Sequence, residues 1–250
     1  MIRLDFVKIA LFIAACPSFL TAAEVLPNCY KRAGIELPAT NSTILLVDGN
    51  VQADFSGRKM AGKVLKEVEG GDMLVLASYR QGKVSIDLLG VVPSVAPEKL
   101  DHVEFPSEFS KNTYSRCVKK SNFEYPLKIR SALGKVMPFD SHSSYPGEDH
   151  LKILTSLLNQ YVPSDAKGLT LYWFSDGSYN ETQFNRIAAQ LEYPEQVINS
   201  IESTGMGIPS MPKNSRVVMY SKTTYQPQKS GSPWQSYFDA IGIKFEQKSY

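Results

Sequence analysis

Two aspartates in this 250-residue chain each follow an apolar, strand-like run, and their type and placement are the features of the sequence best suited to chemistry. Asp48 follows the run 43–47, and Asp176 follows the run 169–174 and one serine. Runs that are apolar throughout indicate strands buried on both faces, and ligands of open α/β sheets bind at the carboxyl ends of such strands. The two carboxylates therefore predict one shared ligand site. Aspartates at strand ends also cap the loops that follow, so a purely structural role stays open.

The first aspartate belongs to a predicted β-α-β unit. Apolar residues recur at helical spacing over residues 60–68, the pair Gly70-Gly71 ends this helix, and residues 73–77 form the next apolar run. The two strands should therefore be parallel. Residues 84–88 alternate apolar and polar side chains after a short turn, which predicts an antiparallel hairpin strand at the edge of the sheet.

The rest of the chain continues to alternate helical and strand-like segments. Helices are predicted over residues 109–136, 151–162, 183–203 and 234–241, and short strands over residues 216–220 and 243–245. A segment rich in Ser, Gly and Pro, residues 138–147, predicts a loop. This order predicts an α/β fold with a mostly parallel central sheet, one antiparallel edge strand and helices on both faces, a three-layer sandwich of Rossmann type.

Together these features resemble the von Willebrand factor A (VWA) fold of exported bacterial proteins. In that fold a first strand ends in Asp-x-Ser-x-Ser, a hairpin edge strand follows the second strand, and a later strand ends in Thr-Asp-Gly or Ser-Asp-Gly. Here residues 48–52 read Asp-Gly-Asn-Val-Gln, and residues 175–177 read Ser-Asp-Gly. The resemblance covers the chain from about Ser42 to the C-terminus and implies a non-enzymatic domain that binds another protein.

The resemblance also implies a metal site. In the family these loops form a metal-ion-dependent adhesion site, in which an octahedral Mg²⁺ takes a carboxylate of the partner protein as its last ligand. Asp48, Asn50 and Asp176 would then hold Mg²⁺ or Mn²⁺, with Asn50 in place of a serine. Gln52 stands where the family has its second serine, so the site is degenerate. A metal-free fold that binds proteins through the same rim is the alternative.

An enzymatic alternative is a haloacid dehalogenase-like phosphatase with Asp48 as its nucleophile. That family ends its first strand in Asp-x-Asp-x-Thr, in which the second acid donates a proton. Asn50 cannot act as an acid, and Gln52 lacks the hydroxyl, so the sequence favours a protein that is not an enzyme. His142 and His150 flank a serine-containing loop and are candidate ligands of a transition metal, but a solvated loop histidine and a histidine at a helix start explain them more simply.

The N-terminus predicts export. Two basic residues, an apolar stretch and a pair of alanines make residues 1–23 a signal peptide, which leaves residues 24–250 as a single VWA-like domain. Pro17 interrupts the stretch, which is too short to span a membrane. The segment ending at Cys16 also resembles a bacterial lipobox, in which this cysteine carries a lipid. The expected location is therefore periplasmic or secreted, with an envelope lipoprotein as the alternative.

Two cysteines remain after the predicted signal peptide. In an oxidising compartment Cys29 and Cys117 predict a disulfide that contributes about 2–5 kcal/mol, although two unrelated buried thiols remain open. The chain has 27 Lys and Arg against 25 Asp and Glu, interspersed, so a nucleic-acid partner is not expected. The expected partner is another protein, and analogy with exported VWA domains places it in envelope assembly, secretion or plasmid transfer.

Overall fold

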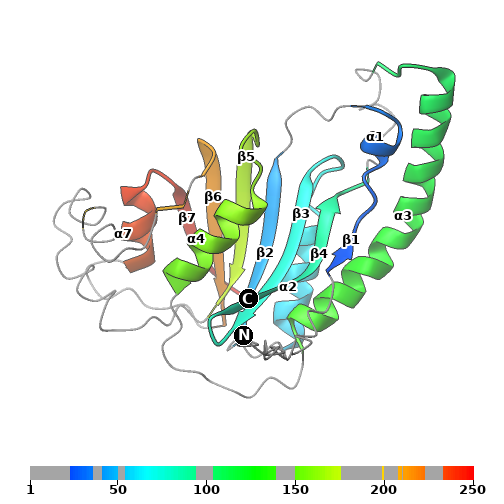
Figure 1. Ribbon diagram of the computed structural model, residues 1–250. Coiled ribbons are helices and arrows are strands. Elements are labelled where there is room, and N and C mark those ends of the chain that lie inside the picture. Colours follow the sequence, from blue (N-terminus) through cyan, green and yellow to red (C-terminus); the bar gives the residue numbers. More distant parts are fainter. Residues whose placement is uncertain are drawn as a thin grey trace, which may run out of the picture.

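The computed structural model describes residues 23–35, 41–49, 54–93, 104–138, 150–175, 199, 208–209, 211–222 and 233–250. Their central element is a seven-stranded sheet with helices on both faces (Figure 1). The strands are β1 (Glu24–Val25), β2 (Ser42–Asp48), β3 (Met73–Arg80), β4 (Lys83–Val91), β5 (Gly168–Phe174), β6 (Asn214–Ser221) and β7 (Lys244–Ser249). The helices are α1 (Cys29–Arg32), α2 (Phe55–Leu65), α3 (Glu108–Val136), α4 (His150–Tyr161) and α7 (Pro233–Ala240).

The strand order is β1-β4-β3-β2-β5-β6-β7. All neighbouring strands are parallel except β3 and β4, which form an antiparallel hairpin. The predicted α/β class, the mostly parallel sheet and the helices on both faces are therefore confirmed. From β2 onward the order is that of a doubly wound sheet, in which the chain first builds outward to one side of β2 and then to the other. The switch point lies between β2 and β5.

One detail of the predicted sheet edge differs. The hairpin strand β4 is not the outermost strand, because β1 pairs with it in parallel over Glu24 and Val25. Gly90 permits this approach, since a Cβ atom there would lie 2.7 Å from the Cβ of Leu26. A two-residue strand carries almost no periodic signal, which is why the sequence did not reveal it.

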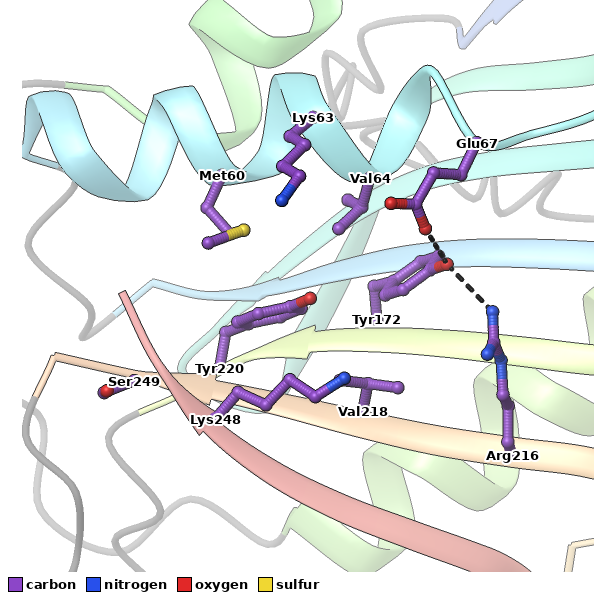
Figure 2. A pocket seen from close by; sticks show the side chains of 10 residues that line it. All are labelled: Met60, Lys63, Val64, Glu67, Tyr172, Arg216, Val218, Tyr220, Lys248 and Ser249. Carbon is purple, nitrogen blue, oxygen red and sulfur yellow. Dashed lines mark hydrogen bonds between the residues drawn. The ribbon is translucent and has the colours of Figure 1, made fainter.

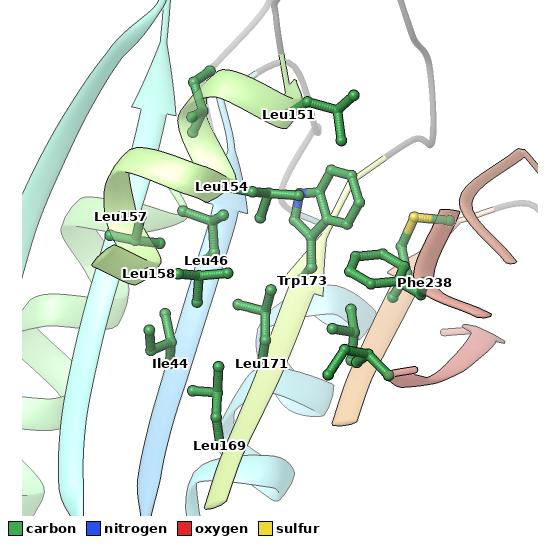
Figure 3. Packing of buried hydrophobic residues seen from close by; sticks show 14 of the residues in the cluster. Ile44, Leu46, Leu151, Leu154, Leu157, Leu158, Leu169, Leu171, Trp173 and Phe238 are labelled. Carbon is green, nitrogen blue, oxygen red and sulfur yellow. The ribbon is translucent and has the colours of Figure 1, made fainter. Parts of the chain in front are cut away.

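Two layers of apolar side chains hold the helices to the sheet. On one face α4 and α7 pack through residues such as Leu154 and Phe238 on Ile44 and Leu171, as Figure 3 shows. On the other face α2 and α3 cover the alternate residues of the same strands, among them Leu45. Because successive strand residues point to opposite faces, an apolar run buried on both sides supplies both layers.

The remaining element predictions are confirmed wherever the structure describes them. The predicted helices at residues 60–68, 109–136, 151–162 and 234–241 correspond to α2, α3, α4 and α7. The predicted helical region 183–203 and the loop 138–147 lie almost entirely outside the described residues, as does the signal peptide apart from its last residue. Within the described residues, no helix combines the length and apolar character needed to cross a membrane.

Candidate functional site

The predicted site begins at Asp48, the last residue of β2. Neighbouring strands lie on both sides of β2, and the Asp48 side chain is completely buried. Its Oδ2 accepts a hydrogen bond of 3.1 Å from Oγ of Ser175, the residue that follows β5. The chain then turns closely against β3, since a Cβ atom on Gly49 would lie 2.8 Å from the carbonyl oxygen of Tyr79. The carboxyl ends of β2 and β5 thus meet as the sequence predicted.

His150, the first residue of α4, is the second partner of this carboxylate. Its Nε2 lies 3.2 Å from Oδ2 of Asp48, and only 4% of the residue is exposed. The imidazole packs edge-on against Tyr79, Trp173 and Trp234, with ring centroids 5.5, 5.6 and 6.1 Å away. The sequence analysis named His150 as a candidate ligand of a transition metal and, more simply, as a residue at a helix start. Its approach to Asp48, 102 residues earlier, depends on how α4 packs.

Tyr79 and Trp173 complete the buried cluster. The indole Nε1 of Trp173 donates a 3.0 Å hydrogen bond to the hydroxyl of Tyr79. Burial raises the pKa of Tyr79 well above its ordinary value of 10, and the negative charge of Asp48 adds to this effect. The tyrosine therefore stays neutral at physiological pH and serves as a hydrogen-bonding group rather than as a base.

A serine, a histidine and an aspartate meet here, but their arrangement is not that of a hydrolase. In a catalytic triad the histidine lies between the nucleophile and the acid and accepts the proton of the nucleophile. Here Ser175 donates to Asp48, and the carboxylate stands between the serine and the histidine. Asp48 and Ser175 are both 0% exposed, so a substrate cannot reach them in this conformation.

The surroundings of Asp48 differ from those of an open, hydrated metal site. Mg²⁺ prefers an octahedral shell of oxygen ligands and keeps several waters, whereas this carboxylate lies among hydrogen-bond donors and aromatic rings. Within the described ranges, no group of three or more His, Cys, Asp or Glu side chains is placed to hold an ion. The other two predicted ligands, Asn50 and Asp176, lie outside those ranges, as do Gln52 and His142.

A separate open cavity of about 220 Å³ lies between α2 and strands β5, β6 and β7 (Figure 2). We call it the tyrosine groove, and its lining residues are Met60, Lys63, Val64, Glu67, Tyr172, Arg216, Val218, Tyr220, Lys248 and Ser249. Figure 2 shows Met60 and Lys63 descending from α2 toward the rings of Tyr172 and Tyr220 on the sheet. These rings stack with a centroid distance of 6.4 Å.

The polar groups of the tyrosine groove form a chain of contacts. Nη2 of Arg216 donates to the Tyr172 hydroxyl at 3.2 Å, and this hydroxyl donates to Oε2 of Glu67 at 3.5 Å. Burial raises the pKa of Tyr172, while the charge of Arg216 opposes that rise. Nearby, Lys248 lies 2.8 Å from Glu246. A second hollow of about 600 Å³ adjoins the groove and is lined in part by Lys59, Lys63 and Lys66.

The sequence did not identify the tyrosine groove, although a signal for it was present. Arg216, Val218 and Tyr220 alternate along β6, so they lie on one face of the sheet. What the pattern could not show is that a hollow remains between α2 and this face.

The predicted disulfide is present. Cys29 of α1 and Cys117 of α3 are joined, with 5.5 Å between their Cα atoms. Such a bond forms and persists in oxidising compartments, so the protein fits a non-cytoplasmic setting.

Comparison with models of known protein families gives no match for this chain, and comparison with curated proteins gives none either.

Proposed function

We propose that this protein is an exported, non-enzymatic, VWA-like domain that binds another protein and does so without a metal ion at Asp48. The observation that carries the proposal is the state of this carboxylate, which is 0% exposed and engaged by Ser175 and His150. A nucleophile must reach its substrate, and an adhesion-site ligand must reach both an ion and the ion's waters. Burial of Asp48 therefore favours a structural role over a role as a nucleophile or as a metal ligand.

The strand arrangement supports the VWA-like part of the proposal. From β2 onward, the order has one antiparallel strand beside the second strand, as the resemblance expects. Other doubly wound proteins share the order itself, so the fold alone does not assign a function.

The tyrosine groove supports protein binding. Tyrosine and arginine are enriched in protein interfaces and among the residues that dominate their binding energy. Arg216, Lys63 and Lys248 are exposed along this groove, Tyr172 and Tyr220 are only 4% and 6% exposed, and Glu67 is the one acidic lining residue. We therefore place an acidic segment of the partner here.

In-cell crosslinking tests where the partner binds. A photoreactive amino acid at Lys63 should give a discrete adduct, and Arg216→Glu should abolish it by reversing the charge beside the groove. The matched control position is Lys83, an exposed residue at the start of β4. Adducts of the same size from both positions, or adducts unchanged by Arg216→Glu, would contradict binding in the groove.

Thermal unfolding tests the absence of a metal. A ligand that binds only the folded state raises its melting temperature. We expect the same melting temperature in EDTA, Mg²⁺ and Mn²⁺. A metal-dependent rise that disappears in Asp48→Asn would instead establish the adhesion-type site. Hydrolysis of a generic phosphate ester that is lost in the same variant would establish the phosphatase alternative.

The predicted location remains part of this proposal. The disulfide supports an oxidising compartment such as the periplasm or the exterior, with the lipoprotein form as the alternative. The mass of the protein isolated from cells decides between cleavage after Ala23 and lipidation of Cys16.

A further inference from the structure

Helix α3 has two sides of opposite character. One side packs on the rest of the molecule through Tyr114, Ser121, Ala132 and Val136, which are buried, and the disulfide at Cys117 fixes it further. In Figure 1 the helix runs along the outside of the β1 edge of the sheet, so its other side forms a long convex ridge.

The outer side of α3 combines large apolar and basic side chains. We call it the α3 stripe, and it consists of Phe109, Arg116, Lys119, Lys120, Phe123, Leu127 and Arg130, all of them exposed. At 3.6 residues per turn these positions fall within roughly a third of the helix circumference, opposite the buried side. The stripe extends about 30 Å along the helix axis.

The exposure of the apolar members is unusual. Phe109 is 80% exposed, Phe123 is 78% exposed and Leu127 is 57% exposed. Among the described residues, five large hydrophobic side chains are exposed, and three of them belong to this one stripe. Single exposed apolar residues are normal, but apolar residues gathered on one surface mark an interaction site.

The charge on this helix is equally concentrated. Although the whole chain has a formal net charge of only +2, α3 holds seven Lys and Arg against two Glu. Three of the seven, Lys111, Lys128 and Lys135, lie outside the stripe. Lys128 pairs with Glu24 at 3.4 Å, and Lys120 of the stripe lies 3.7 Å from Glu124. The stripe itself contains no acidic residue, so its complement is an anionic surface.

The residue types favour a lipid surface over a protein. The cores of protein interfaces are depleted in lysine, whereas helices that lie on membranes combine Phe and Leu with many Lys and Arg. A convex ridge also suits a flat surface better than a groove. We propose that the α3 stripe binds anionic phospholipid bilayers, with Phe109, Phe123 and Leu127 entering the headgroup region and the four cations contacting lipid phosphates.

Vesicle partitioning tests the proposal. The protein is purified in the form that cells accumulate, and its molar partition coefficient is measured on phosphatidylcholine vesicles with and without about one third phosphatidylglycerol. We expect partitioning at least about tenfold stronger on the anionic vesicles, since each cation near such a surface adds to the attraction. Any vesicle binding through the N-terminus contributes equally to both kinds of vesicle and to every variant, so it does not affect these comparisons.

Two stripe variants and two controls separate the contributions. The triple variant Phe109→Ser, Phe123→Ser and Leu127→Ser should lose most of the binding to anionic vesicles. The quadruple variant Arg116→Gln, Lys119→Gln, Lys120→Gln and Arg130→Gln should lose the dependence on anionic lipid and on salt. The controls are Phe55→Ser, which changes a side chain 75% exposed on α2, and Lys244→Gln on β7, and both should bind as the wild type does.

Unchanged far-ultraviolet circular dichroism shows that each variant is folded. Equal partitioning on neutral and anionic vesicles, or anionic binding that survives in both stripe variants, would overturn the proposal. The proposal would also be overturned if the stripe variants lost self-association, or lost binding of the groove partner, while they kept lipid binding. Those results would assign the stripe to a second copy or to a protein.

Discussion

At the scale of single residues, Asp48 is the centre of the candidate site. Its carboxylate has no contact with solvent, and the Ser175 hydroxyl and the His150 ring are at hydrogen-bond distance from the same oxygen. A buried charge is tolerated only where such partners compensate for the lost water. The cluster therefore joins β2, β5 and α4 at the switch point of the sheet.

Removal of this carboxylate should destabilise the protein. In Asp48→Ala, Ser175 and His150 lose their buried hydrogen-bond partner and a cavity remains. The free energy of unfolding should therefore fall by about 3 kcal/mol. Asp48→Asn keeps the shape and one acceptor oxygen, so the loss should be about 1–2 kcal/mol. Urea denaturation monitored by tryptophan fluorescence measures both values, because Trp173 and Trp234 lie beside His150.

Asp165→Ala is the control for these substitutions, because this aspartate is exposed in the loop before β5. It should change the free energy of unfolding by less than about 0.5 kcal/mol. If Asp48→Ala has an equally small effect, Asp48 does not hold these elements together. An open site for a ligand would then become the better interpretation.

At the scale of elements, the sequence predicted most of the secondary structure because the signals are local. The apolar run of β2 and the helical spacing in α4 depend on neighbouring residues alone. The pairing of strand ends at Asp48 followed from the topology of parallel sheets. The partners His150 and Tyr79 could not be predicted, since contacts between distant elements depend on how side chains pack.

Short helices and strands were not predicted from the sequence for a related reason. Helix α1 is four residues long, and its stability comes from its surroundings rather than from its own pattern. Asn28 caps it by accepting from the backbone N–H of Lys31, and Cys29 links it to α3. Neither the position nor the partner of such an element is encoded in periodicity.

The first turn of α2 offers a prediction at this scale. Oδ1 of Asp54 accepts from the Gly57 N–H at 2.8 Å, and Lys222 lies 3.4 Å from Oδ2. The Gly57 hydrogen bond in particular lowers the pKa of Asp54 below its ordinary 3.8, with a smaller contribution from Lys222. Asp54→Ala should lower the free energy of unfolding by about 1 kcal/mol at neutral pH.

The lowered pKa of Asp54 also determines how its contribution to stability depends on pH. A carboxyl group whose pKa is lower in the folded state stabilises that state above its unfolded pKa of 3.8, and this contribution is lost as the pH falls through the folded value. The difference between wild type and Asp54→Ala should therefore shrink below about pH 4. In Asp54→Asn the cap remains without the charge, so this variant should lose less stability than Asp54→Ala in neutral solution. A difference that grows in acid would refute the assignment.

At the scale of the whole molecule, the disulfide joins the N-terminal segment to the long peripheral helix. Cys29 and Cys117 are 88 residues apart, and the apolar cluster around them is the smallest of the three in the described residues. This cluster includes Tyr30, Val91 and Tyr114, and it is separate from the two main core layers. The region therefore has little apolar packing of its own and depends on the covalent link.

The double variant Cys29→Ala and Cys117→Ala should lower the free energy of unfolding by about 2–5 kcal/mol, because the unfolded chain loses a long closed loop. The loss should also be local. Amide hydrogens of α1 and of the first half of α3 should exchange faster, while those of β2 and β5 keep their protection relative to global unfolding. Hydrogen exchange with mass spectrometry, before and after reduction of the wild type, follows both regions at once. Reductant should leave the double variant unchanged, which makes it the internal control. If α3 keeps its protection after the disulfide is lost, packing against β4 is sufficient to hold this helix in place.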